Sequence, residues 1–166
     1  MKPNRDGTIS IDDTDRLLLS ILQENAELSL SDLAKKVNLT KMAISNRIKR
    51  LKKVVIIDGS CYKLNPVKLG QDYTVISTIT CNYKGVAQEK IAKTISKLPG
   101  VMSVYLLFGT SDILLIARRS DRTSAKELVY EISKIAGVRN TLTMIPHTVI
   151  KESLAIDISK RAAVGQ

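Results

Sequence analysis

The chain has 166 residues, of which 44% are hydrophobic and 25% are charged, and its formal net charge is +10 at pH 7. This composition is typical of a folded globular protein, and the length allows one domain of ordinary size or two small ones. No apolar run approaches the roughly 18 residues that a membrane-spanning helix needs, and the first residues lack the apolar core of a signal peptide. We therefore expect a cytoplasmic protein without a membrane partner.

The chain has few residues suited to metal or redox chemistry. Its two cysteines, Cys61 and Cys81, are far apart in the sequence, and its single histidine is His147. We expect two free thiols, no metal and no cofactor. The sequence also contains no nucleophile triad, no paired catalytic carboxylates and no phosphate-binding loop, so we do not expect an enzyme.

Positive charge is concentrated in one stretch of the first half. Between residues 33 and 57 there are eight cations and no anion. A field of one sign attracts a polyanion such as double-stranded DNA. The alternative explanation is an ordinary solvated surface that binds no partner. The eight cations are Lys35, Lys36, Lys41, Arg47, Lys49, Arg50, Lys52 and Lys53.

Three helices are predicted before residue 54. Asp12 and Asp13 precede an apolar stripe and indicate the start of the first helix, where the helix dipole stabilises acids. Ser29, with Asp32 three residues later, indicates the start of the second, and Thr40 is the expected N-cap of the third. The expected inward-facing residues are Leu17, Leu18, Ile21, Leu22, Leu33, Ala34, Val37, Ile44, Ile48 and Leu51.

The connection between the second and third helices has the features of a helix-turn-helix motif. Asn38 lies between Val37 and Leu39 and tolerates the left-handed backbone that such a tight turn needs. Ala34 provides a small side chain where the third helix crosses the second. Because the turn length, the asparagine and the small residue agree, we predict a helix-turn-helix.

The outer face of the third helix is the candidate DNA-contacting surface. Short polar and amide groups reach base edges, and asparagine can bind adenine with two hydrogen bonds. Phosphate contacts supply affinity with little sequence information. The alternative is an ordinary solvated helix face, which the three-helix pattern and the one-sign charge disfavour. The candidates for base edges are Lys41, Met42, Ser45, Asn46 and Lys49, and those for phosphates are Arg47, Arg50, Lys52 and Lys53.

Residues 54–64 predict a hairpin after the third helix. Two β-prone runs flank Asp58-Gly59, which is a strong two-residue turn signal. The hairpin would be the wing of a winged helix-turn-helix domain over residues 1–64, with Lys63 near DNA, or it would only brace the helices. Asn65-Pro66 and Gly70 predict a linker over residues 65–71.

Residues 72–152 alternate strand and helix patterns. The β-prone stretches lie at 71–83, 101–108, 112–118 and 138–150, and a helical stripe lies at 87–98. In the first strand, the odd-numbered residues from Tyr73 to Tyr83 share one face. A second helix is expected to begin at Thr123 or Ser124, with Glu127 completing a capping box for Ser124.

An internal echo supports two related halves. ISKLPGV at 95–101 and ISKIAGV at 132–138 recur 37 residues apart. Each joins a helix end, a glycine C-cap and a strand start. Two such halves give the order βαββαβ, which predicts a ferredoxin-like domain over residues 72–152 and makes the whole chain an α+β protein.

One face of this sheet is expected to need a partner. Two helices cover one face, and the other carries apolar and hydroxyl side chains, although a large bare apolar patch is rare on a monomer. Two sheets from two subunits, packed face to face, would cover each other. We therefore expect a homodimer, whose two-fold symmetry also suits palindromic DNA half-sites.

These elements in this order resemble the Lrp/AsnC (feast/famine) family of transcription regulators. The resemblance covers roughly residues 10–152 and is carried by IDDTDRLLLSILQENAELSLSDLAKKV, LTKMAISNRIKRL, LNPVKLG and FGTSDILL. It implies a sequence-specific DNA-binding regulator made of dimers, which can assemble into tetramers or octamers. It also implies modulation by an amino acid or a similar small molecule bound between ferredoxin-like domains.

The resemblance further implies where an effector would bind. A glycine turn offers backbone N–H groups to a carboxylate, and Asp112 has the charge to hold an α-ammonium group. The alternative is that Gly109 only makes the turn and Asp112 caps it. In the family, effectors contact the turn that here comprises Gly109, Thr110, Ser111 and Asp112, and a part of the fourth strand that here comprises Thr141, Thr143, Met144 and Ile145.

Two positions depart from the family pattern. Val55 stands after the third helix where many relatives have glycine, and a β-branched residue resists a left-handed cap. We therefore expect this helix to end differently and the wing to shift. Pro146 falls in the fourth predicted strand and indicates an edge, a bulge or a strand end there. Residues 153–166 form a tail that is apolar enough to pack on the protein, at a place that the sequence does not indicate.

Two other functions are weighed. Some proteins that resemble this family are haem-pathway decarboxylases, whose chemistry needs histidines and arginines around a carboxylated macrocycle, and the single His147 disfavours that function. An architectural, chromatin-like protein would bind DNA with weak sequence preference, and the net charge of +10 permits it. A specificity ratio near one on random DNA would favour this alternative.

Overall fold

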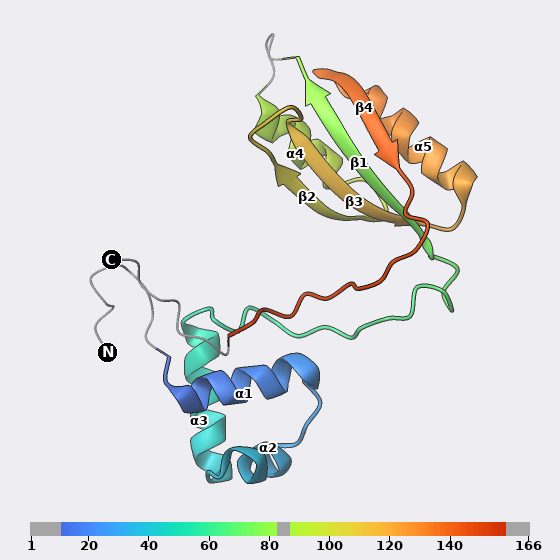
Figure 1. The fold of residues 1–166 in the computed structure, drawn as a ribbon. Coiled ribbons are helices and arrows are strands. Elements are labelled where there is room, and N and C mark those ends of the chain that lie inside the picture. The colour runs from blue at the N-terminus through green and yellow to red at the C-terminus, as the bar shows by residue number, and fades with distance from the viewer. Residues whose placement is uncertain (1–10, 83–86, 159–166) are drawn as a thin grey trace. The chain divides into compact units, whose positions relative to one another are not determined.

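The computed structural model describes residues 11–82 and 87–158. These residues form two compact units, one made of residues 11–62 together with 152–158 and the other of residues 63–151. The first unit is helical and the second is built around one sheet (Figure 1). None of the helices in the described residues combines the length and the apolar character needed to cross a membrane.

Three helices make up the first unit, and each begins after a predicted capping residue. The Asp12 carboxylate accepts a hydrogen bond from the backbone N–H of Asp15 at 2.7 Å. The hydroxyls of Ser29 and Thr40 each accept a backbone N–H three residues further on. One such cap contributes about 1 kcal/mol to helix stability. The helices are α1 (Asp13–Glu24), α2 (Leu30–Val37) and α3 (Lys41–Lys53).

The three helices enclose one apolar core, and their turn confirms the helix-turn-helix. Asn38 has φ 55° and ψ 48°, which is the predicted left-handed conformation. One inward-facing prediction is wrong, because Leu17 is 47% exposed and Leu19 is buried in its place. The stripe of α1 is therefore rotated by part of a turn from the predicted one. The buried core residues are Leu18, Leu19, Leu33, Ala34, Val37, Ile44 and Leu51.

The described part of the C-terminal tail, residues 153–158, packs on α1 of the same unit. The backbone N–H of Ile156 donates to the side-chain oxygen of Gln23 at 2.7 Å, and the Gln23 amide donates back to the carbonyl of Ile156 at 3.1 Å. Arg16 donates to the carbonyl of Ile158, whose side chain packs against the helical core. The tail, which the sequence could not place, thus closes over the first helix.

The predicted hairpin wing is wrong, because residues 54–64 form no strand. The backbone N–H groups of Ile56 and Ile57 donate to the carbonyl of Leu51 at 3.0 and 3.2 Å. Both isoleucine side chains pack against the helical core. Burial of two aliphatic side chains outweighs the local β preference, so these residues cover the helices and do not pair as strands.

The expectation that Val55 would resist a left-handed cap is also wrong. Val55 has φ 57° although its side chain is 67% exposed and gains little from packing. A left-handed conformation costs an L-residue about 1–2 kcal/mol. The hydrogen bonds that Val54, Val55 and Ile56 donate to the last turn of α3 hold the chain in this conformation. The packing of Ile56 and Ile57 on the helical core therefore determines the backbone conformation of this cap, against the conformational preference of Val55.

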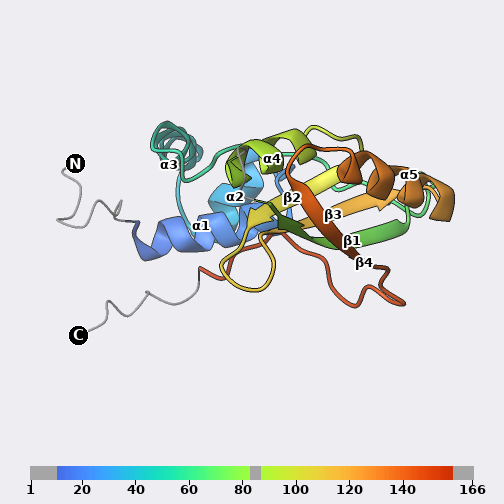
Figure 2. The ribbon, with the colours of Figure 1, turned by 90° about the horizontal axis from the view of Figure 1, so that it is seen from above.

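The second unit has the predicted βαββαβ order. Its sheet order is β2-β3-β1-β4, and each neighbouring pair is antiparallel. Helices α4 and α5 lie on the same face of this sheet (Figure 2). The elements are β1 (Tyr73–Cys81), α4 (Gln88–Ile95), β2 (Val101–Leu106), β3 (Ile113–Arg119), α5 (Arg122–Ser133) and β4 (Val138–Met144).

Strand β1 supplies the centre of the second core. Val75, Ser77, Ile79 and Cys81 are at most 4% exposed, as their predicted shared face requires. Tyr83, the last residue predicted on this face, lies outside the described residues. The alternation confirms that one face of β1 is covered by the helices.

The two echoed segments occupy equivalent places in the two halves. Gly100 and Gly137 have φ of 77° and 95°, and each directly precedes a strand. Both conformations favour glycine, because a Cβ atom is crowded at positive φ. The echo therefore reflects a repeated helix-to-strand turn.

The N-cap predicted for α5 is wrong. The cap is Asp121, whose carboxylate accepts the backbone N–H of Ser124 at 2.8 Å, while the Ser124 hydroxyl accepts the backbone N–H of Asp121 at 3.2 Å. Ser124 is thus the third helical residue and not the cap, so the predicted pairing with Glu127 does not form. An aspartate caps a helix as well as a serine does. The helix therefore begins after Asp121, which exchanges two hydrogen bonds with Ser124.

The other face of the sheet is apolar and uncovered within the unit. Opposing residues in the strand register point to the same face, and Thr78 opposes both Leu114 and Leu142. Leu142 is 61% and Tyr105 is 51% exposed. Strand β4 ends at Met144, so Pro146 marks a strand end. The apolar residues of this uncovered face are Ile76, Tyr105, Leu114, Ile116, Leu142 and Met144.

Candidate nucleic-acid interface and ligand pocket

The outer face of α3 presents most of the predicted DNA-contacting residues. Ile44 and Leu51 are buried on the inner side, which leaves the other side of the helix to solvent. Met42 is 70% exposed, and Ser45 is half-buried. The predicted residues that are exposed are Lys41, Met42, Asn46, Lys49, Lys52 and Lys53. An amide and four ammonium groups are thus exposed on a helix that carries no acid.

Arg47 and Arg50 have a different environment, in a cluster with Asp12 and Asp15 that we call the Arg–Asp cluster. Arg47 Nη1 lies 2.6 Å from Asp12 Oδ2 and 2.7 Å from Asp15 Oδ1. Arg50 Nη2 pairs with the other oxygen of Asp15, which is fully buried. The cluster joins the start of α1 to the middle of α3. It neutralises two of the cations that the sequence suggested for phosphates.

The cluster favours the charged forms of Asp12 and Arg47. Partial burial opposes ionisation of Asp12, but hydrogen bonds from Arg47 and from the backbone of Asp15 hold the pKa of Asp12 below its usual value. Hydrogen bonds to Asp12 and Asp15 raise the pKa of Arg47. Because the pKa of Asp12 is lowered by folding, its contribution to stability is present at neutral pH and is lost as the pH falls into the acidic range.

A sequence signal for this cluster existed. Asp12 and Asp15 are three residues apart, as are Arg47 and Arg50. Residues with this spacing lie on one face of a helix. Two such pairs of opposite charge on helices that pack together are therefore able to meet, but the packing of α1 on α3 was needed to see that they do.

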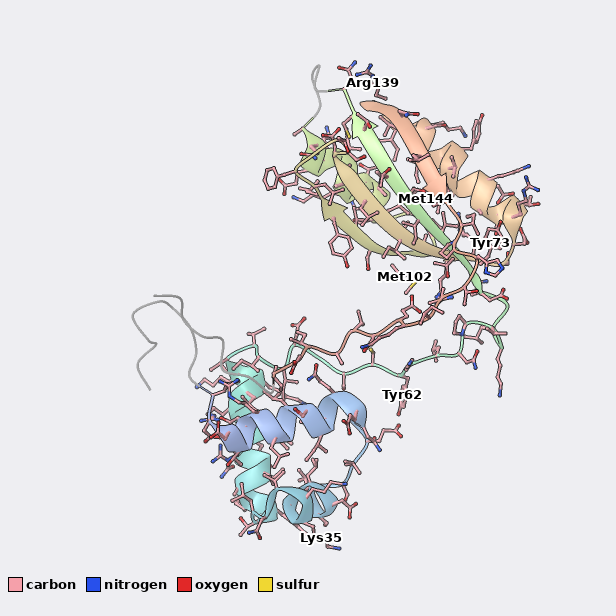
Figure 3. The ribbon with its side chains drawn as sticks, in the orientation of Figure 1. Lys35, Tyr62, Tyr73, Met102, Arg139 and Met144 are labelled. Carbon is pink, nitrogen blue, oxygen red and sulfur yellow. The ribbon has the colours of Figure 1, made fainter. Side chains whose placement is uncertain are left out.

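The second candidate site is a pocket at the turn between β2 and β3. It has a volume of about 580 Å³ and lies where β1 ends and β4 begins. Three residues expected from the sequence, Gly109, Thr110 and Asp112, line it. Four lining residues were not anticipated, namely Thr80, Cys81, Asn82 and Arg139. Arg139 lies at the start of β4 (Figure 3), and its guanidinium is the positive charge of the pocket.

Asp112 anchors this turn to the central strand. Its carboxylate accepts the backbone N–H of Cys81 at 2.6 Å, and its own N–H donates to the carbonyl of Ile79 at 2.9 Å. Its carbonyl accepts the Gln88 amide at 2.6 Å. Burial, and secondly the charge of Asp112, raise the pKa of the Cys81 thiol, so this thiol stays protonated. One carboxylate oxygen of Asp112 is therefore used in holding the pocket together.

The other predicted effector residues lie away from the pocket. Thr141 and Thr143 oppose the buried Ile79 and Ser77 and therefore face the helix layer. The Thr143 hydroxyl is 2.8 Å from that of Ser77. Met144 is at the far end of β4 from Arg139 (Figure 3). The half-buried Ser111 and the exposed Ile145 are also absent from the pocket lining.

The fold and the two sites together define a class of protein. A helix-turn-helix with an exposed basic helix, joined to a ferredoxin-like unit with a pocket at its glycine turn, is the architecture of a ligand-responsive transcription regulator. The model of the AsnC-type helix-turn-helix domain matches residues 11–52, and that of the Lrp/AsnC ligand binding domain matches residues 74–156. The chain belongs to the Lrp/AsnC family of DNA-binding transcription regulators.

Individual relatives agree with this assignment. An HTH-type transcriptional regulator of Pyrococcus furiosus is 34% identical over 149 residues, which are 90% of this chain and 99% of the relative. A Neisseria meningitidis transcriptional regulator, solved as a complex with L-methionine, has a TM-score of 0.84 at 25% identity over 89% of this chain and 96% of that one. An AsnC family regulator from Agrobacterium tumefaciens has a TM-score of 0.82 at 27% identity, covering 88% and 96% of the two chains.

Proposed function

We propose that α3 of this regulator lies in the DNA major groove and recognises a specific sequence. The observation that carries this proposal is the exposed, acid-free face of α3, with the Asn46 amide beside ammonium groups. Asn46 is the residue for a base edge, and Ser45 and Met42 flank it. Lys41, Lys49 and Lys53 are placed for phosphates.

Two substitutions separate base contacts from phosphate contacts. Asn46→Ala is expected to weaken binding to a duplex selected from a random pool by about 1–3 kcal/mol, and to weaken binding to a scrambled duplex much less. Lys49→Ala is expected to weaken both and to reduce the slope of log K against log salt by about one. Fluorescence anisotropy of labelled duplexes at several salt concentrations measures both effects.

Lys126→Ala is the matched control for Lys49→Ala. It removes one positive charge from an exposed position on α5 of the other unit, and it should change the binding curve of neither duplex. If wild type binds selected and scrambled duplexes equally, and Asn46→Ala does not alter that ratio, then the protein is of the architectural kind with weak sequence preference.

We also propose that the uncovered face of the sheet joins two copies into a homodimer, which is the unit of tetramers or octamers. The support is the exposure of Leu142 and Tyr105 on a continuous apolar face, which is costly on a monomer. Leu142→Asp is expected to weaken self-association at least about 100-fold, because it would bury a charge without a partner. Sedimentation velocity over a concentration series measures this, and Tyr130→Asp, on the exposed side of α5, is the control. Equal dissociation of the two variants would argue against this interface.

The pocket at the glycine turn is proposed to bind an amino-acid effector. The guanidinium of Arg139 is suited to an α-carboxylate, and Thr80, Thr110 and Asn82 offer polar groups around it. The L-methionine complex of the Neisseria relative supports this class of ligand. Arg139→Met is expected to weaken binding of L-methionine, or of another amino acid found in a thermal-shift panel, at least about tenfold. Arg122→Met, at the exposed start of α5, is the control, and an unchanged affinity in Arg139→Met would rule out this role.

A further inference from the structure

The two arginines of the basic stretch are both held by carboxylates. Arg47 and Arg50 are two of the eight cations between residues 33 and 57, and the other six are lysines. Arginine binds phosphate and guanine with two parallel hydrogen bonds, which a lysine ammonium cannot do. The Arg–Asp cluster thus engages the side chains with the strongest intrinsic affinity for DNA.

The two acids of the cluster differ in their exposure. The Asp15 side chain is fully buried and pairs with both arginines, whereas the Asp12 side chain is 50% exposed and, among the described residues, pairs with Arg47. The Arg47 side chain is 27% exposed and lies in the sequence between Ser45-Asn46 and Lys49, on the helix proposed to contact DNA. Asp12 is therefore the acid that both occupies Arg47 and presents a negative charge to solvent beside α3.

We propose that Asp12 is an affinity-setting residue for DNA binding, because it shares Arg47 with Asp15 and repels the backbone of any duplex on which α3 lies. Both effects lower the affinity for specific and scrambled sequences by about the same factor. Asp12 therefore limits the absolute affinity for DNA, and the ratio of specific to non-specific affinity, which the base contacts of Asn46 set, stays unchanged. This inference rests on the proposed function of α3.

The test compares two neighbouring acids. Asp12→Asn removes the charge and keeps the helix cap, since asparagine is as good an N-cap as aspartate. Asp13→Asn makes the same change of charge one residue later, at a side chain that is fully exposed and lies 3.9 Å from the Arg16 guanidinium. Binding to a selected and a scrambled duplex is measured by anisotropy across a range of salt concentrations, after circular dichroism has shown that each variant is folded.

Asp12→Asn is expected to bind the scrambled duplex about tenfold more tightly, with a salt slope steeper by about one. Its affinity for the selected duplex should rise by a similar factor, so that the ratio of the two affinities stays close to that of wild type. Asp13→Asn should leave the slope and both affinities close to wild type. In the double variant Asp12→Asn/Arg47→Met the added slope should disappear, because the cluster then again has one arginine for its one remaining aspartate, Asp15, and carries no net charge.

Three results would overturn the inference. Equal slopes and affinities for Asp12→Asn and Asp13→Asn would show that only net charge matters. A steeper slope that persists in the double variant would show that Arg47 is not the source of the added positive charge. Wild-type protein without salt-dependent binding to either duplex would reject the DNA-contacting role of α3 itself, and this inference with it. If Asp12→Asn does not fold, Asp12→Ser, which also retains a cap, replaces it in the same comparison.

Discussion

Asp15→Asn is expected to lower the free energy of unfolding of the helical unit by about 3 kcal/mol. Asp15 is fully buried and pairs with Arg47 and Arg50, and removing one partner of a buried ion pair costs about 3–5 kcal/mol. The lower end applies here because the arginine side chains are 27% and 39% exposed and regain some hydration. The carboxylate also accepts the backbone N–H of Asp12 at 3.1 Å, so the start of α1 is weakened as well.

Urea unfolding measured by circular dichroism gives the change in free energy, and hydrogen exchange of amides in α1 and α3 shows that the helical unit is the one affected. Asp13→Asn is the matched control, because its carboxylate is fully exposed and two residues away. We expect it to leave the unfolding curve unchanged within error. If Asp15→Asn were as stable as this control, the Arg–Asp cluster would have no structural role.

Gly100→Ala is expected to destabilise the ferredoxin-like unit by about 2–4 kcal/mol. Gly100 has φ 77°, which alone costs an alanine about 1–2 kcal/mol. An added Cβ would also lie 2.4 Å from the carbonyl oxygen of Arg118. The backbone cannot easily move away, because the Gly100 carbonyl accepts the N–H of Arg118 at 2.9 Å. Strand β3 would have to shift or lose that hydrogen bond.

Gly70→Ala separates the two costs. Gly70 has a similar φ of 63°, but no atom lies within 4 Å of the position of an added Cβ. This variant should therefore lose only the conformational part, about 1 kcal/mol. Thermal and urea unfolding of the two variants measures the difference. Equal losses would show that the contact with Arg118 relaxes at no cost.

Features that depend on a few neighbouring residues could be predicted from the sequence. The caps at Ser29 and Thr40, the left-handed Asn38 and the glycines of the echoed segments depend on backbone geometry within three or four residues. The alternation of β1 and the βαββαβ order followed from the same kind of local pattern. The face of α3 that is proposed to contact DNA could be predicted for the same reason, since an acid-free helix face is a property of one element.

The tertiary structure decided where separate elements compete or meet. Residues 54–57 have strand propensity, but their isoleucines gain more by packing on the helices, and Val55 accepts a strained conformation as a result. The sequence predicted that Arg47 contacts phosphates. In the structure, the packing of α1 on α3 places the carboxylate of Asp12, which is 35 residues away, 2.6 Å from the Arg47 guanidinium. Arg139 lines the pocket because the sheet register places the start of β4 beside the end of β1. Local patterns report local forces, whereas ion pairs and pocket walls arise between residues that only the packing of the whole unit brings together.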